Sequence, residues 1–133
     1  MAQNRTIAVR ASSAMNLGAS GGTSYSSTYS NRDCRGISVI VKNTAGGGSS
    51  PTLVAKLQEY VAGAGWVDVT GATTASIAGG TPGTATFVVY PGQTVGSNTG
   101  VSRPLGKVWR IFYTIGGTST PTVTFTVDAQ LHV

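Results

Sequence analysis

The chain has 133 residues, 19 of them glycine, with 10% charged residues and a net charge of +5. This length predicts one domain that buries roughly two thirds of its surface and folds without disulfides or metals. The nine lysines and arginines are scattered singly, which argues against a nucleic-acid-binding protein, and the low charge indicates that a partner covers part of the surface.

Cys34 is the one cysteine, which excludes an internal disulfide and a cysteine-built metal site. Residues 1–11 lack the apolar core of a signal peptide, and no run approaches the ~18 apolar residues of a membrane span. We therefore expect a protein that is made in a cytoplasm, needs no cofactor, and contacts neither a membrane nor, directly, nucleic acid.

The N-terminal quarter of the chain predicts one short strand and one long loop. Residues 1–5 form a polar, basic tip, and residues 6–11 alternate in polarity as a strand does. Residues 17–36 are rich in Gly, Ser and Thr, and we expect a flexible loop or arm there because aliphatic residues are scarce. Either this segment is a mobile surface loop, or it is an arm that orders against a neighbour through Tyr25 and Tyr29.

Two long hairpins of one design are predicted in the rest of the chain. Residues 123–133 alternate strictly between apolar and polar, and residues 108–115 are a β-branched and aromatic run on the other side of a Gly/Ser/Thr/Pro turn. A similar turn at residues 46–51 separates strand-like residues 37–42 from residues 53–60. We interpret the similarity as a pseudo-duplication within one domain, since a tandem array needs at least about three copies to close its core.

Shorter strands lie between these hairpins. A tight turn at residues 62–65 leads into a strand at residues 66–70. A weak strand at residues 75–77 and a clear one at residues 84–90 follow, and Pro91-Gly92 then predicts a type II turn.

No segment predicts a helix. About six to eight short strands with turns between them predict an all-β fold, an antiparallel β-sandwich of the jelly-roll or immunoglobulin-like kind, formed by residues 1–133 as a single domain. The apolar alternation predicts a core that includes Ile37, Val39, Val41, Leu53, Leu57, Val67, Val69, Phe87, Val89, Ile111, Phe125 and Val127.

Titratable side chains are too few and too dispersed for catalysis. His132, near the end of the last strand, is expected to be solvated. Glu59 and Asp68 flank a turn and could approach each other, but the turn lacks the further oxygen ligands of a calcium loop, so two solvated acids are expected. Cys34 has no histidine placed to activate it. We therefore expect no enzyme and no bound metal.

The aromatic residues leave two interpretations open. Trp66, Trp109, Tyr60, Tyr90 and Tyr113 could form a stacking platform for sugar rings, as in β-sandwich carbohydrate-binding modules. Alternatively, Trp109 and Tyr113 belong to the core, and Trp66 and Tyr60 form an ordinary cross-strand pair, which is the interpretation that the strand phases favour. A sugar platform requires aromatic rings exposed in a row.

Several motifs of residues 37–133 occur in a characteristic order. They are Gly-x-Ser-Ser-Pro-Thr-Leu, Leu57-Gln58-Glu59, Gly65-Trp66-Val67-Asp68-Val69, Val89-Tyr90-Pro91-Gly92, Arg103-Pro104 and Trp109-Arg110, followed by the Thr-rich last strand. On these motifs the chain resembles a family of small β-sandwich structural proteins of tailed bacteriophages, which are described as minor capsid or head decoration proteins.

The resemblance implies a non-enzymatic virion protein that binds the outer surface of an assembled capsid in many copies and stabilises it. Its partners would be the major capsid protein and further copies of itself, with a trimer expected from the habit of such proteins. The same features also fit a structural domain associated with a tail or a head fibre, or a carbohydrate-binding β-sandwich module.

The resemblance does not extend to the first 36 residues, and we expect the capsid contact there. Cations and rings on a flexible backbone suit an acidic or mixed surface, and such binding weakens with salt. Deleting residues 18–30 is then expected to leave the fold intact. The expected contact residues are Arg5, Tyr25, Tyr29, Arg32 and Arg35.

Overall fold

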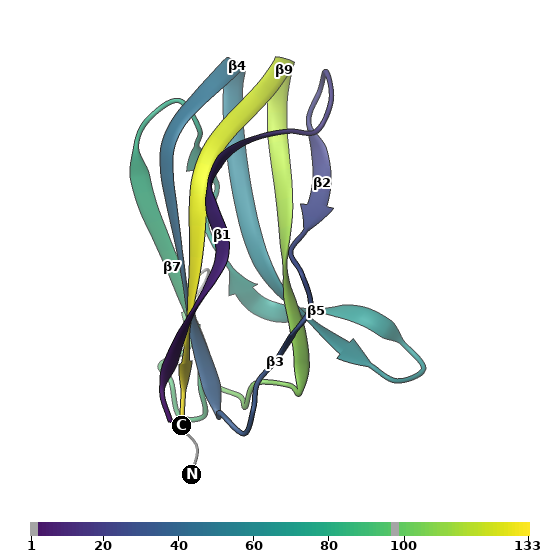
Figure 1. Ribbon diagram of the computed structural model, residues 1–133, viewed down its shortest axis with the longest axis vertical. Coiled ribbons are helices and arrows are strands. Elements are labelled where there is room, and N and C mark those ends of the chain that lie inside the picture. The colour runs from purple at the N-terminus through teal and green to yellow at the C-terminus, as the bar shows by residue number, and fades with distance from the viewer. Residues whose placement is uncertain (1–2, 97–98) are drawn as a thin grey trace.

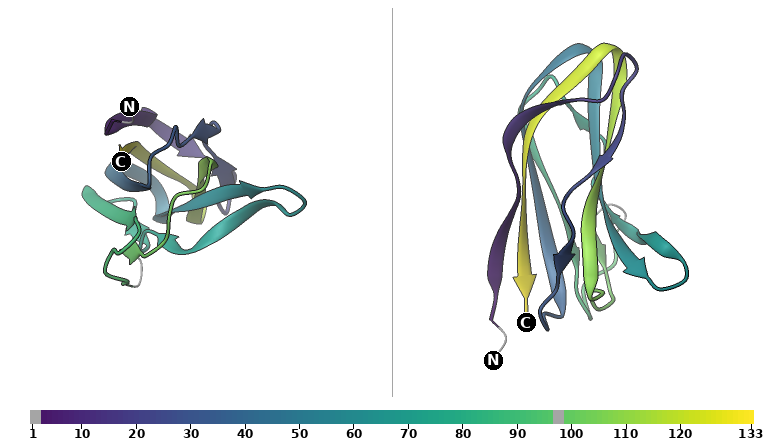
Figure 2. Two further views of the ribbon diagram at one scale, coloured as in Figure 1. Left: turned by 90° about the horizontal axis from the view of Figure 1, so that it is seen from below. Right: turned by 45° about the vertical axis from the view of Figure 1, so that its right-hand side comes forward.

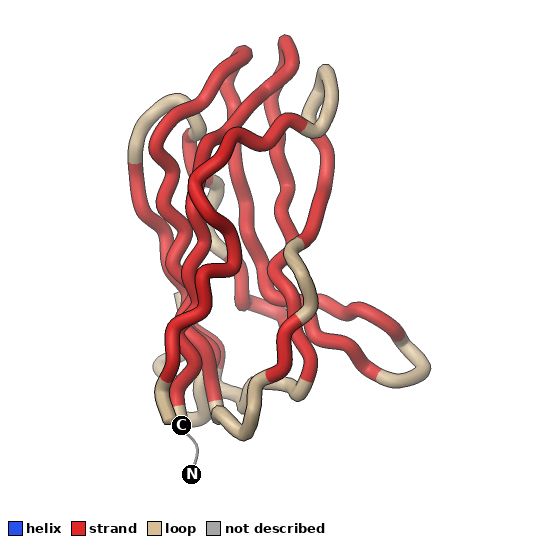
Figure 3. The backbone as a smooth tube through the Cα atoms, in the orientation of Figure 1, coloured by secondary structure: helices blue, strands red, loops and turns tan. Residues whose placement is uncertain are grey.

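The computed structural model describes residues 3–96 and 99–133, which contain nine β-strands and no helix (Figures 1 and 3). The all-β prediction is confirmed, and the strands outnumber those predicted. They are β1 (Arg5–Asn16), β2 (Gly22–Tyr25), β3 (Tyr29–Ser30), β4 (Gly36–Val61), β5 (Gly65–Thr73), β6 (Ile77–Ala78), β7 (Gly83–Val89), β8 (Gly100–Val101) and β9 (Val108–His132).

The two longest strands, β4 and β9, pair with each other along almost their whole length. Residues 36–47 of β4 pair with residues 122–132 of β9, and residues 52–59 of β4 pair with residues 109–116 of β9. Register shifts separate the two stretches. At this point both strands bend together, so that the two-stranded ribbon folds over on itself at the top of Figure 1.

The two predicted hairpins are therefore wrong in their pairing, although their strands and turns exist. Residues 37–42 pair with the C-terminal half of β9, and residues 53–59 pair with its N-terminal half. Alternation of apolar side chains determines which face of a strand is buried and leaves the neighbouring strand undetermined. The local sequence could thus predict each strand but not its partner.

The repeated Gly/Ser/Pro turns are the two places where the ribbon bends, and they contact each other. Gly48 and Gly117 both have positive φ angles. A Cβ atom on Gly48 would lie 2.8 Å from the Cα of Pro121, and one on Gly117 would lie 2.9 Å from the carbonyl oxygen of Ser49. Since each glycine meets the backbone of the other turn, both bends need a glycine at this position.

Folding the ribbon over produces two facing sheets (Figure 2). The first sheet contains β1, the C-terminal half of β9, the N-terminal half of β4 and β7, with the short β8 parallel to β7. The second contains β2 and β3, the N-terminal half of β9, the C-terminal half of β4, and β5 and β6. This arrangement is a jelly roll, one of the two sandwich types expected.

The core lies between the two halves of the ribbon. Tyr113 and Phe125, from opposite halves of β9, meet edge to face with ring centroids 5.3 Å apart. The predicted core residues are buried except Val67, which is half-buried. Val67 pairs with Glu59 near the turn of the β4–β5 hairpin. This hairpin projects away from the sandwich (Figure 1).

Residues 17–36 are not the unpaired loop that their composition predicts. β2 and β3 pair with the N-terminal half of β9, and Ser26 exchanges hydrogen bonds of 2.8 and 2.9 Å with the backbone of Ile111. Backbone pairing thus compensates for the scarcity of aliphatic side chains. Deleting residues 18–30 would remove β2 and β3 from the edge of the second sheet, so the expectation that the fold survives this deletion is wrong on structural grounds.

Candidate interaction surfaces

The described residues form no cluster of three or more His, Cys, Asp or Glu side chains that could hold a metal ion. Over residues 3–96 and 99–133, no helix has the length and apolar character needed to cross a membrane. Glu59, Asp68 and His132 are each predicted from the sequence to be solvated. The structure confirms this for Asp68, whereas Glu59 is buried and His132 is half-buried.

Glu59 is buried, with 4% of its surface exposed. Its carboxylate accepts a 2.7 Å hydrogen bond from Arg103 and a second bond from the backbone N–H of Gly106. Asp68 of β5 lies directly opposite Gln58 of β4, whereas Glu59 lies opposite Val67. The two acids therefore point to opposite faces of the second sheet. Glu59 therefore anchors the segment before β9 and forms no carboxylate pair.

His132 is half-buried rather than solvated. Its Nε2 lies 2.8 Å from the hydroxyl oxygen of Ser38, and its ring meets Tyr90 edge to face with centroids 6.4 Å apart. Ser38 belongs to β4, and Tyr90 follows the end of β7. Both are far from His132 along the sequence, so the sequence alone could not predict these contacts. The residue secures the end of the first sheet.

Three of the predicted contact residues gather at the end of the sandwich where β1 begins and β9 ends (Figure 1). Arg5 donates a 3.0 Å hydrogen bond to the carbonyl oxygen of Ser30, and the backbone N–H of Arg35 donates a 2.7 Å bond to the carbonyl oxygen of His132. Arg32 lines a shallow hollow together with the exposed acid Asp33. We call this end the basic end, defined by Arg5, Arg32, Arg35 and Lys107.

The backbone under the basic end is held firmly. The side-chain amide of Asn31 donates bonds of 3.2 and 2.9 Å to the carbonyl oxygens of Leu105 and Gly106. The backbone N–H of Asn31 donates a 3.0 Å bond to the carbonyl oxygen of Lys107. Lys107 lines the same hollow as Arg32, and it is an additional cation that sequence reasoning did not select, because nothing local marks it as a neighbour of Arg32.

The two predicted tyrosines do not join the basic end. Tyr29 stacks on the buried Trp109 with centroids 4.8 Å apart, and it is half-buried. Tyr25 is 60% exposed and lies on the outer face of the second sheet, where the guanidinium carbon of Arg110 is 4.0 Å from its ring centroid. The predicted set of five residues therefore divides between one end of the sandwich, its core and one outer face.

The opposite end of the sandwich is uncharged. It is formed by the two bends of the ribbon at residues 46–51 and 116–121 and by the loop at residues 17–21, none of which contains a charged residue. The backbone N–H of Thr120 donates a 3.0 Å hydrogen bond to the carbonyl oxygen of Ala19, which joins the loop to one bend. The protein thus has one basic end and one neutral end of Gly, Ser and Thr.

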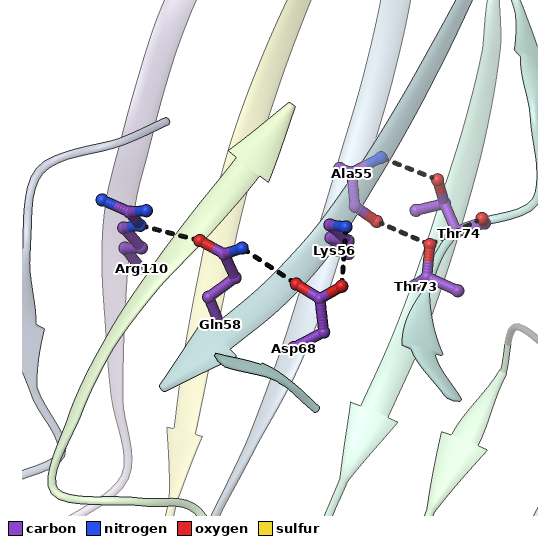
Figure 4. A network of polar contacts seen from close by, with 7 residues as sticks. All are labelled: Ala55, Lys56, Gln58, Asp68, Thr73, Thr74 and Arg110. Atoms are coloured by element: carbon purple, nitrogen blue, oxygen red, sulfur yellow. Dashed lines mark hydrogen bonds and ion pairs between the residues drawn. The ribbon is translucent and has the colours of Figure 1, made fainter. Parts of the chain in front are cut away.

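The outer face of the second sheet carries a polar chain that crosses three strands (Figure 4). The Nε of Arg110 donates a 2.9 Å hydrogen bond to Gln58, whose amide nitrogen donates a 2.8 Å bond to Asp68. Lys56 pairs with the other oxygen of Asp68 at 2.8 Å. The hydrogen bonds from Lys56 and then Gln58 lower the pKa of Asp68, so this carboxylate is ionised at neutral pH.

Aromatic rings flank the same polar chain. The guanidinium carbon of Arg110 lies 4.3 Å from the ring centroid of Trp66 as well as 4.0 Å from that of Tyr25. The predicted cross-strand pair of Tyr60 and Trp66 is confirmed, with centroids 5.5 Å apart and an edge-to-face arrangement. We call this surface the Arg110 face, defined by Tyr25, Gln58, Tyr60, Trp66 and Arg110.

A folded-over ribbon in two facing sheets places the chain among jelly-roll domains, an architecture found in viral capsid and lectin domains. Among solved structures, the chain is similar to a chain in the structure of infectious bursal disease virus Gx strain, with a TM-score of 0.50 and 15% sequence identity. The match covers 98% of this chain and 33% of that one, so the present chain spans about a third of the viral chain. This likeness shows the fold.

No protein-family model matches the sequence, and a comparison with curated proteins finds no significant match. The resemblance to tailed-phage decoration proteins therefore stays a prediction that rests on the motifs of residues 37–133.

Proposed function

We propose that the chain is a non-enzymatic structural protein of a tailed-phage virion, which binds the outer surface of the capsid in many copies and stabilises it. The proposal rests on the difference in charge between the two ends of the jelly roll, one of which is basic while the other is uncharged. The similarity to a chain from a virus structure and the motif resemblance support it. The partner is then an acidic patch of the major capsid protein.

The basic end has the properties that such a contact needs. Arg32, Arg35 and Lys107 are exposed, and the backbone beneath them is hydrogen-bonded to residues 105–107, just before β9. Cations held on an ordered backbone lose less conformational entropy on binding than cations on a mobile arm. The contact we propose is therefore a preorganised end surface, which replaces the flexible arm expected from the sequence.

Many copies bound weakly are sufficient for stabilisation, because neighbouring contacts raise the effective concentration of each copy. Self-association as a trimer belongs to the proposal and rests on the family resemblance. A position on the tail or on a head fibre is the alternative, and it would use the same fold.

Replacing Arg32, Arg35 and Lys107 together with glutamine is expected to weaken binding to undecorated capsids about tenfold, since each exposed ion pair contributes about 0.2–1 kcal/mol. Binding by the unmodified chain should also weaken with salt, and the triple variant should show a smaller salt dependence. Co-sedimentation with capsids across a salt series measures both quantities.

The matched control is Lys42→Gln, which removes an exposed cation from the outer face of the first sheet and should leave capsid binding unchanged. If the triple variant decorated capsids as fully and with the same salt dependence as the unmodified chain, the basic end would be ruled out as the contact.

A further inference from the structure

The two outer faces of the sandwich differ in their aromatic content. Tyr25 and Tyr60 are the aromatic side chains classed as exposed among the described residues, at 60% and 53%, and both lie on the Arg110 face with the half-buried Trp66. The strand pairing of the other sheet puts mainly Thr, Ser and Gln side chains outward. The Arg110 face therefore supplies the exposed aromatic rings that a sugar platform requires, with Tyr60 and Trp66 meeting edge to face rather than lying in a flat row.

The guanidinium of Arg110 is fixed in orientation. Rings lie against it at 4.0 and 4.3 Å, and its Nε is bonded to Gln58. Within the described part of the chain, Nε is the Arg110 nitrogen that donates a side-chain hydrogen bond, so the two terminal nitrogens remain available. A guanidinium with both terminal nitrogens available binds a carboxylate in the bidentate manner.

The charge of the face favours an acidic ligand. Lys56 is neutralised by Asp68 at 2.8 Å, whereas no acid of the described residues pairs with Arg110. The face thus retains one positive charge beside its exposed rings. Aromatic rings supply apolar area for the C–H face of a sugar ring, and the adjacent amide and guanidinium groups supply hydrogen-bond donors and acceptors for its rim.

We propose that the Arg110 face binds a carboxylated sugar, with Arg110 pairing with the carboxylate and with Tyr25, Tyr60 and Trp66 packing against the sugar rings. This site is separate from the basic end, and its occupancy does not depend on a capsid. We favour a carboxylated sugar over a protein partner because Arg110 has no acidic partner among the described residues and lies directly against two aromatic rings.

The two tryptophans make a direct test possible, because Trp66 lies on the face and Trp109 is fully buried. The probe is tri-galacturonate, a trisaccharide of carboxylated sugars, and maltotriose is its neutral counterpart. In a titration of the ¹⁵N-labelled chain, tri-galacturonate is expected to shift the indole N–H resonance of Trp66 in a saturable manner and to leave that of Trp109 in place. Maltotriose should bind at least about tenfold more weakly, since it lacks the carboxylate.

Arg110→Gln is expected to weaken tri-galacturonate binding at least about tenfold, and Arg110→Lys should not restore it, because lysine lacks the planar fork. The control Lys42→Gln, which removes a cation from the other face, should change the affinity by less than about twofold. An unchanged, dispersed Trp109 indole resonance in each variant shows that the core is folded.

The proposal is overturned if tri-galacturonate gives no saturable Trp66 shift at millimolar concentration, or if maltotriose binds equally well. Equal loss of binding in Arg110→Gln and Lys42→Gln would also overturn it, since it would indicate attraction to the overall charge alone. If the Arg110 variants bound capsids poorly while the unmodified chain bound no sugar, the face would be a protein contact instead.

Discussion

Replacing Phe125 with alanine is expected to lower the free energy of unfolding by about 3–5 kcal/mol, because the lost transfer free energy and the cavity left behind add together. Phe125 is completely buried, its ring meets Tyr113 from the facing sheet at 5.3 Å, and the guanidinium of Arg10 lies 4.5 Å above it. The Phe125 side chain therefore contacts the facing sheet through Tyr113 and strand β1 through Arg10. Urea denaturation measures the change.

Thr124→Ala is the matched control, since Thr124 is the preceding residue on the same strand and faces outward. This change is expected to cost well under about 1 kcal/mol. Equal destabilisation by the two substitutions would contradict the assignment of inward and outward faces in β9.

Replacing Glu59 with glutamine is expected to cost about 2–3 kcal/mol, although the side chain keeps nearly the same size. The carboxylate accepts bonds from Arg103 and from the backbone of Gly106. Glutamine has one acceptor oxygen and no charge, so it loses the charged hydrogen bond, which is worth roughly 1.5–3 kcal/mol. We place the effect below the ~3–5 kcal/mol of a fully buried pair, because the side chain of Arg103 is 46% exposed. Thermal and urea unfolding measure it.

Asp68→Asn provides the comparison, because Asp68 also pairs with one cation, Lys56, but its side chain is 52% exposed. Its loss is expected to cost less than about 1 kcal/mol. If Asp68→Asn proved as damaging as Glu59→Gln, burial would not be what distinguishes the two acids.

The sequence predicted the longer strands, most of their buried faces and the turns, because these depend on residues that are close along the chain. The type II turn at Pro91-Gly92 is an example: Gly92 has a φ of 85°, and the N–H of Gln93 donates a 3.1 Å bond to the carbonyl oxygen of Tyr90. The sequence did not predict the short strands β2, β3 and β8. The pairing of β4 with β9 depends on contacts between distant segments, and alternation carries no information about them.

The same limit explains the outcome for the candidate site. Arg5, Arg32 and Arg35 are predicted contacts because they are cations of the N-terminal region that the predicted core does not need, and the fold gathers them at one end. Tyr25 instead lies beside Arg110, which is reached only through the pairing of β2 with β9. No local signal in the sequence indicates that contact.

The most direct test of the proposed function is a cryo-electron microscopy reconstruction of the assembled virion that carries this chain. We predict density for many copies of the jelly roll on the outside of the head, each with Arg32, Arg35 and Lys107 facing the capsid and the Gly/Ser/Thr bends pointing outward. Jelly-roll density confined to the tail, or copies on the head that contact the capsid through the neutral end, would contradict it.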